Sequence, residues 1–233
     1  MDSNKLPDDY KRGFKDFLNC KIDLSHRPLI PREETEDWVK KAIEEIKNCS
    51  KKEIKCLDIF SGSGCIGIAV LKNIPECVCD FAEIEDIFLE QIKINLKLNS
   101  IDLERVKIIK SDIFSNISSK YDFILANPPY VAEERISELG EDVKQYEPSI
   151  ALMGGKLGMD FIKMFLQELS NYLDKDGIAY MEIDPQQEKI IKEILLNNHS
   201  LLENYDARGN YRNFEFLADQ FGKIRVLKIY SVK

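Results

Sequence analysis

The fold is decided by residues 54–67, which read IKCLDIFSGSGCIG. Residues 54–59 form an apolar run that is typical of a buried strand, and residues 60–64 form a glycine turn. A helix is expected to open at Cys65 and to continue through Leu71. A glycine turn between a strand and a helix leaves the backbone uncovered, so a ligand can approach it closely. The stretch therefore predicts a ligand-binding turn in an α/β protein.

Strands and helices are expected to alternate along the rest of the chain. Alternation of this kind predicts an α/β, Rossmann-like fold, in which helices cover both faces of a mostly parallel sheet with an antiparallel C-terminal edge. The expected strands after the first are 77–83, 106–109, 121–126, 178–183, 213–218 and 224–230. The other expected helices are 34–47, 87–98, 159–173 and 186–196, and residues 5–19 predict one short amphipathic helix near the N-terminus.

The composition limits the classes of function. The chain has 233 residues, of which 44% are hydrophobic, and this is enough for one substantial core. A net charge of −8 argues against broad binding to nucleic acid, because neutralising phosphates requires clustered Lys and Arg. No apolar run reaches the roughly 18 residues of a membrane span, and the polar start lacks a signal-peptide core. We therefore expect a soluble, cytoplasmic protein without a membrane partner, and the charge disfavours a nucleic-acid partner.

The cysteines do not suggest a metal site. The six cysteines fall in or beside predicted core elements, and His26 and His199 complete no zinc-type spacing with them. Cys77 and Cys79 would share one face of a strand, and we interpret them as buried thiols. The sequence therefore predicts no metal, and reduced cysteines fit a cytosolic compartment.

Acidic residues follow the next two predicted strands. Glu83 ends the second strand, 19 residues beyond Gly64, where an acidic residue binds a ribose hydroxyl pair in open α/β sheets. Asp112 follows the third strand and could accept a hydrogen bond from an adenine amino group. The turn keeps the spacing Gly-x-Gly-x-x-Gly through Gly67, which also allows a dinucleotide such as NAD. The spacing alone leaves the nucleoside open.

The turn Asn127-Pro128-Pro129-Tyr130 ends the fourth strand. Its two prolines fix the backbone and remove two N–H donors, so the turn offers carbonyl oxygens and the Asn127 amide to an NH2 group. It provides no proton relay of the sort that a dehydrogenase needs. Methyl transfer needs little more than an aligned nucleophile, an activated methyl group and the exclusion of water. The alternative is a plain turn that ends a strand.

Ordered motifs along the chain point to one family. They are LIPREETE (29–36), LDIFSGSGCI (57–66), SDIF (111–114), NPPYV (127–131), YEPSIALMGG (146–155) and DQFGKIRV (219–226). With these motifs the sequence resembles the protein-glutamine N5-methyltransferases that modify peptide chain release factors, within the class I S-adenosylmethionine-dependent family. The resemblance covers about residues 23–230. The NPPY motif alone also marks adenine and guanine amino methyltransferases, whereas the first and fifth motifs point to glutamine.

The resemblance implies a role for each site residue. The turn from Phe60 to Gly64 would hold the methionine part of S-adenosylmethionine, Glu83 the ribose, and Asp112 with Ile113 the adenine. Asn127 and the Pro128 carbonyl would accept hydrogen bonds from the glutamine NH2, with Tyr130 packed against it. The cofactor-binding candidates are Asp58, Phe60, Ser61, Gly62, Ser63, Gly64, Glu83, Asp112, Ile113 and Asn127, and the catalytic candidates are Asn127, Pro128, Pro129 and Tyr130. The family also implies the Gly-Gly-Gln loop of a release factor as the substrate, and Arg32, Glu36 and Glu147 as residues that shape its pocket.

The sequence departs from the family pattern in two respects. Family members usually carry Gly at the position of Phe60, and Asp-x-Phe-x-Gly-x-Gly also occurs in enzymes that methylate guanine in ribosomal RNA. Bacterial members carry a helical N-terminal domain that grips the release factor, whereas about 22 residues precede the matching region here. We expect residues 1–22 to form a short helical extension and residues 23–233 to form the methyltransferase domain. Either a partner subunit replaces the missing domain or nothing does.

Two other functions compete with glutamine methylation. An N-methyltransferase of adenine or guanine in RNA or DNA would need a basic groove, which the net charge of −8 disfavours. A non-catalytic subunit would use the fold for binding alone, and the intact glycine turn and Asn127 argue against it.

Overall fold

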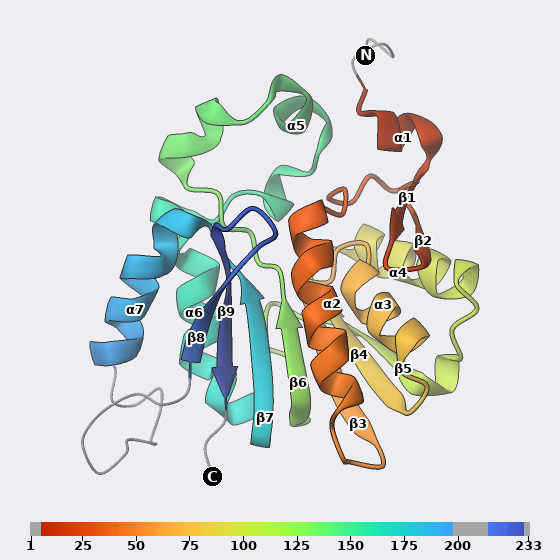
Figure 1. The fold of residues 1–233 in the computed structure, drawn as a ribbon. Coiled ribbons are helices and arrows are strands. Elements are labelled where there is room, and N and C mark those ends of the chain that lie inside the picture. Colours follow the sequence, from red (N-terminus) through yellow and green to blue (C-terminus); the bar gives the residue numbers. More distant parts are fainter. Residues whose placement is uncertain (1–5, 198–213, 231–233) are drawn as a thin grey trace.

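A computed structural model describes residues 6–197 and 214–230, which form a seven-stranded sheet and a two-stranded hairpin (Figure 1). The strand order of the large sheet is β5-β4-β3-β6-β7-β9-β8. The strands are β3 (Ile54–Ile59), β4 (Cys77–Glu83), β5 (Val106–Lys110), β6 (Tyr121–Ala126), β7 (Leu173–Glu182), β8 (Phe214–Ala218) and β9 (Ile224–Tyr230). Strands β5 to β7 in this order pair in parallel, while β9 runs antiparallel to both β7 and β8. The predicted α/β fold with an antiparallel edge is confirmed.

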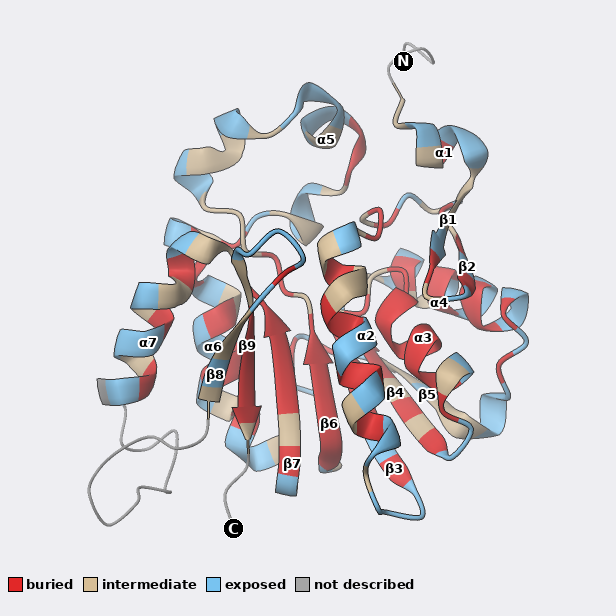
Figure 2. Cartoon of the chain, in the orientation of Figure 1, coloured by how far each residue is buried: buried red, intermediate tan, exposed pale blue. Residues whose placement is uncertain are grey.

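Helices cover both faces of this sheet and divide the core into two clusters. Helices α2 (Glu33–Lys47), α3 (Cys65–Asn73) and α4 (Asp86–Leu98) pack on one face, and α6 (Asp160–Tyr172) and α7 (Glu188–Asn197) pack on the other. Strand β6 shows why both faces are apolar: Phe123 and Leu125 enter the first cluster, and Ile124 and Ala126 enter the second. Figure 2 shows β6 buried along its whole length, with the helices buried mainly where they face the sheet.

The N-terminal segment differs from its prediction. Instead of one helix over 5–19, the chain forms α1 (Asp8–Arg12) and a hairpin of β1 (Phe14–Phe17) and β2 (Cys20–Asp23). The turn residues Leu18 and Asn19 both have positive φ, which matches the right-handed twist of a two-residue hairpin. The hairpin docks on α4, where Asn95 and Asn99 accept hydrogen bonds from the β2 backbone at 2.7 and 3.0 Å.

Smaller differences concern element boundaries. Strand β7 begins at Leu173 rather than at 178, and a 3₁₀ turn (Pro185–Gln187) precedes α7. The expected strand 213–218 is β8, but Asn213, like His199, lies outside the described residues. The long connection between β6 and α6 contains α5 (Glu141–Tyr146) and 3₁₀ turns at Glu133–Glu138, Ser149–Ala151 and Lys156–Gly158. Figure 1 shows α5 beyond the carboxyl ends of the parallel strands, at the same end of the sheet as α1.

Two cysteines of β4 lie in the core. Cys77 and Cys79 are free and fully buried, as predicted. Among the helices of residues 6–197 and 214–230, none combines the length and the apolar character that a membrane crossing requires.

Candidate active site

A pocket opens at the carboxyl ends of the parallel strands. It contains about 980 Å³ of empty space, its open mouth included, which lies within the range of small-ligand sites. Its walls come from the tips of four neighbouring strands, from the chain before and within the start of α2, and from α4, α6 and the β6–α6 connection. The lining includes Phe60, Ser61, Gly62, Ser63, Glu83, Asp112, Ile113, Asn127 and Pro129 among the residues predicted from sequence.

The glycine turn after β3 forms the floor next to α3. Ser61 closes the turn, since its hydroxyl donates to the Asp58 carbonyl at 2.7 Å and its backbone N–H donates to Ala82 at 3.2 Å. The Asp58 side chain lies beneath the turn, fully buried, and accepts a hydrogen bond from the Gly67 N–H at 2.9 Å. Asp58 and Gly64 therefore support the turn and do not line the pocket.

Two pocket residues hold an uncommon backbone conformation. Phe60 has a φ of 61° and Ile113 a φ of 48°, both in the left-handed region that favours glycine. Non-glycine residues in this region store strain and occur preferentially at functional sites. A glycine, which the family resemblance leads us to expect at the position of Phe60, would adopt this conformation without strain. The ring of Phe60 makes an edge contact with Phe161 on α6, with ring centroids 6.0 Å apart.

The carboxylate of Glu83 is fixed at the end of β4. It accepts hydrogen bonds from the backbone N–H groups of Gly62, Ile84 and Glu85, at 2.7, 2.8 and 3.0 Å. Burial raises the pKa of Glu83, and these three N–H groups act in the opposite direction by stabilising the carboxylate. The bond to Gly62 holds the acidic side chain against the glycine turn, so one rigid unit presents both to a ligand.

Asp112 and Ile113 follow β5 on the other side of Glu83. The Ser115 hydroxyl accepts a hydrogen bond from the Asp112 N–H at 3.1 Å, and this bond shapes the loop. The Asp112 side chain is exposed and lines the pocket, whereas Ile113 is buried with its apolar side chain against the pocket wall. A carboxylate beside an apolar surface suits a flat heterocycle with an amino group.

The tip of β6 brings Asn127 to the same pocket. Its Nδ2 donates to the Thr35 hydroxyl on α2 over 3.4 Å, and among the described residues no partner is found for its Oδ1. Pro128 and Pro129 are buried, and Pro129 lines the pocket. The side chain of Tyr130 is not part of the pocket lining, and its hydroxyl donates to the buried Glu182 on β7 at 2.9 Å. The turn is thus anchored at both ends.

Segments before α2 and after α5 close the part of the pocket that lies beside Asn127. Arg32 lines the pocket and forms an ion pair with the buried Glu147 at 2.5 Å. Glu36, in contrast, accepts a hydrogen bond from the Leu18 N–H at 2.8 Å and holds the hairpin turn. A side chain at Gly158 would overlap the carbonyl oxygen of Tyr130, so this glycine lets the connection pack directly on the turn.

Some lining residues were not singled out from sequence. Thr35 lies inside the 29–36 motif, and Ile150 and Ala151 lie inside the 146–155 motif, so motif membership was the available signal. Phe88 on α4 and Phe161 on α6 carried no such signal. They reach the pocket only because the helices pack on the sheet.

Comparison with known proteins supports a methyltransferase. A model of the methyltransferase small domain matches residues 42–145. A release factor glutamine methyltransferase from Clostridium botulinum is 34% identical over 230 residues, which cover 97% of this chain and 76% of that protein. One from Streptococcus pneumoniae is 33% identical and covers 96% of this chain and 74% of that protein.

Solved structures with low sequence identity share the fold. A ribosomal protein L11 methylase from Lactobacillus delbrueckii subsp. bulgaricus superimposes with a TM-score of 0.59 at 18% identity, over 90% of this chain and 83% of that one. The hMettl16 catalytic domain, solved with a MAT2A 3'UTR hairpin, gives 0.67 at 14% identity, over 92% and 76%. At these identities the likeness shows a methyltransferase fold and nothing about the substrate. The identity to the two curated relatives over nearly the whole chain is the decisive finding, and by it the chain belongs to the release factor glutamine methyltransferase family.

Proposed function

We propose that the protein transfers a methyl group from S-adenosylmethionine to the side-chain amide nitrogen of a glutamine in a peptide chain release factor, in its Gly-Gly-Gln loop. The observation that carries this proposal is the meeting of Asn127, the glycine turn and Glu83 in one pocket, in a chain that belongs to this family. We place the reaction in the cytoplasm, where release factors act.

The cofactor side of the pocket fits a nucleoside with an amino-acid tail. The turn from Phe60 to Gly64 would hold the methionine part, Glu83 the two ribose hydroxyls, and Asp112 with Ile113 the adenine. The side chain of Glu83 accepts from Gly62 and is held rigid at the turn, so it can accept from a ribose without rearrangement. When bound, S-adenosylmethionine supplies a methyl group that its sulfonium has already activated.

The substrate side would fix the glutamine amide. Asn127 Oδ1 and the Pro128 carbonyl would accept the two N–H bonds of the substrate NH2, which aligns the nitrogen with the methyl group. An amide nitrogen is a weak nucleophile because its lone pair is delocalised into the carbonyl. Two acceptors stabilise the positive charge that grows on nitrogen as the N–C bond forms and the S–C bond breaks, and the surplus proton then leaves to water.

The N-terminal segment belongs to the same structural unit. We propose residues 23–233 as the methyltransferase domain and residues 1–22 as its extension. Tyr10, Phe17 and Ile22 join the core cluster of α2, α3 and α4. In this proposal the extension supports the domain from outside the pocket.

Transfer of labelled methyl groups tests the function. The purified protein would be incubated with S-adenosylmethionine labelled in its methyl group, together with a release factor and, separately, with RNA. We expect label in the release factor and none in a release factor whose loop glutamine is replaced by alanine. Label in RNA instead would establish the adenine or guanine methyltransferase and reject the proposal.

A further inference from the structure

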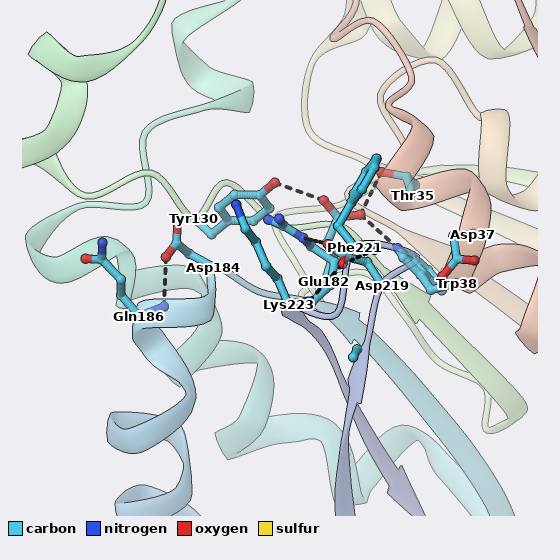
Figure 3. A network of polar contacts seen from close by, with 12 residues as sticks. Thr35, Asp37, Trp38, Tyr130, Glu182, Asp184, Gln186, Asp219, Phe221 and Lys223 are labelled. Carbon is cyan, nitrogen blue, oxygen red and sulfur yellow. Dashed lines mark hydrogen bonds and ion pairs between the residues drawn. The ribbon is translucent and has the colours of Figure 1, made fainter.

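A buried carboxylate stands behind the substrate side of the pocket. Glu182 ends β7 and is 1% exposed. Its Oε2 accepts hydrogen bonds from the Thr35 hydroxyl at 2.6 Å and from Trp38 Nε1 at 2.8 Å, and its Oε1 accepts from the Tyr130 hydroxyl at 2.9 Å. Figure 3 shows these three side chains converging on Glu182 from α2 and from the tip of β6. A buried carboxylate with this many donors is satisfied and fixed in place.

The pKa of Glu182 is raised, because its neighbours offset only part of the effect of burial. Burial raises its pKa, while the hydrogen bonds from Thr35, Trp38 and Tyr130 and the positive charge of Arg225 act in the opposite direction. Trp38 Nε1 can only donate, so Glu182 Oε2 is an acceptor, and the Thr35 hydroxyl donates to this same oxygen at 2.6 Å. The single hydrogen of the Thr35 hydroxyl is therefore committed to Glu182.

This commitment decides how Asn127 is oriented. A hydroxyl whose hydrogen points to Glu182 offers only lone pairs to its other neighbour. That neighbour is Asn127, whose Nδ2 lies 3.4 Å from Thr35 Oγ1. A reversed amide would set two acceptors against each other, so the NH2 of Asn127 must face Thr35 and its Oδ1 must face away. Both Asn127 and Thr35 line the pocket, and Oδ1 is thus turned toward the substrate side.

We propose that Thr35 and Glu182 are positioning residues for methyl transfer, which hold the Asn127 amide with its oxygen toward the substrate NH2. The identity of that NH2 as a glutamine amide rests on the proposed function. Glu182 also accepts a hydrogen bond from the Tyr130 hydroxyl. One carboxylate therefore anchors both ends of the 127–130 turn, directly at Tyr130 and through Thr35 at Asn127. We call the three hydrogen-bonded residues Glu182, Thr35 and Asn127 the orienting relay.

Three substitutions separate orientation from stability. Thr35→Val keeps the shape and removes the hydroxyl, and Thr35→Ser restores it. Trp38→Phe is the matched control, because it removes another donor from the same carboxylate without touching Asn127. We expect Thr35→Val to lower kcat by about 10-fold or more with little change in cofactor affinity. Thr35→Ser should stay close to wild type, and Trp38→Phe should lower the melting temperature while largely keeping kcat.

A second measurement tests the orientation of the Asn127 amide without any methyl transfer. The side-chain amide signal of Asn127 can be assigned in a ¹H–¹⁵N NMR spectrum as the one that Asn127→Ala removes. We expect Thr35→Val to shift this signal toward the position of a free amide, and Thr35→Ser and Trp38→Phe to leave it in place. A Thr35→Val protein with the wild-type Asn127 signal, or with wild-type kcat, would overturn the relay. A wild-type protein that fails to methylate a release factor would instead reject the proposed function, and the NMR comparison would still decide the relay.

Discussion

Asn127 is the side chain on which the proposed reaction depends most directly. Replacing it with alanine removes one of the two acceptors for the substrate NH2 and leaves the glycine turn and Glu83 untouched. We predict that Asn127→Ala lowers kcat by about two orders of magnitude, the usual cost of losing a group that stabilises charge in the transition state. Calorimetry should show an affinity for S-adenosylmethionine close to that of the wild type. An equal collapse of cofactor binding would identify Asn127 as a cofactor ligand first.

Phe60 offers a test of backbone strain in the cofactor turn. Both Phe60→Ala and Phe60→Gly remove the ring and its contact with Phe161, but only glycine relieves a φ of 61°. Alanine is normally more stabilising than glycine because it restricts the unfolded chain. Here we predict the reverse order, with the glycine variant more stable by about 1 kcal/mol. Urea denaturation of the two variants measures the difference, and a more stable alanine variant would show that the turn is unstrained.

Some of the site residues could be predicted from the sequence, and others could not. Glu83, Asp112 and Asn127 could be predicted because each follows a strand, and the carboxyl ends of parallel strands meet at one edge. The orienting relay could not be predicted. Its contacts join Thr35 to Asn127 and to Glu182 across 92 and 147 residues of sequence, and no local pattern encodes such distances.

Helix α3 packs so closely on β4 that one glycine decides the contact. A Cβ on Gly67 would lie 2.5 Å from the ring of Phe81 and 3.0 Å from Cys79 Sγ. We predict that Gly67→Ala destabilises the fold by about 1–3 kcal/mol, the typical cost of overpacking. Adding Phe81→Leu should recover part of the loss in a double-mutant cycle of unfolding free energies. Strictly additive effects would mean that helix and strand tolerate the methyl group without this clash.

The turn between β8 and β9 depends on one carboxylate. Asp219 accepts hydrogen bonds from the N–H groups of Phe221 and Lys223 at 2.9 and 3.0 Å, and from Arg225 Nε at 3.3 Å. Burial raises the pKa of Asp219, but these hydrogen bonds and the charge of Arg225 outweigh burial and leave the pKa below its usual value. The carboxylate therefore stabilises the fold above the pKa of unfolded Asp, about 3.9, and this contribution is lost as pH falls through the lower, folded pKa.

Asp219→Asn tests this turn. We predict a loss of about 1–2 kcal/mol in the free energy of unfolding at neutral pH. The difference from wild type should shrink in acid, where the wild-type carboxyl is also protonated. Denaturation curves at pH 7 and in acid measure both values. A difference that stays constant with pH would mean that the charge of Asp219 contributes nothing.

Burial explains why the central strands were predicted correctly and the N-terminal helix was not. Strands such as 121–126 were placed correctly because they are apolar on both faces and end at prolines or glycines. The N-terminal helix was wrong because the spacing of Phe14, Phe17 and Leu18 suits a helix, while the hairpin turn at Leu18 and Asn19 contains no glycine to mark it.

The whole molecule places cofactor chemistry and substrate recognition on two sides of one pocket. The tips of β3, β4 and β5 form the cofactor side, and the tip of β6, α2 and the connection to α6 form the substrate side. The relatives are longer, since this chain covers 76% of the Clostridium botulinum protein. The proposed chemistry depends on this chain's own residues, whatever delivers the release factor.

The most direct test is to map the methylated atom by mass spectrometry of a release factor incubated with the protein and S-adenosylmethionine. We predict one methyl group on the side-chain nitrogen of the glutamine in the Gly-Gly-Gln loop, and its transfer about 100-fold more slowly when Asn127→Ala replaces the wild-type protein. A methyl group on any other residue, or an unmodified glutamine after full incubation with active protein, would contradict this prediction.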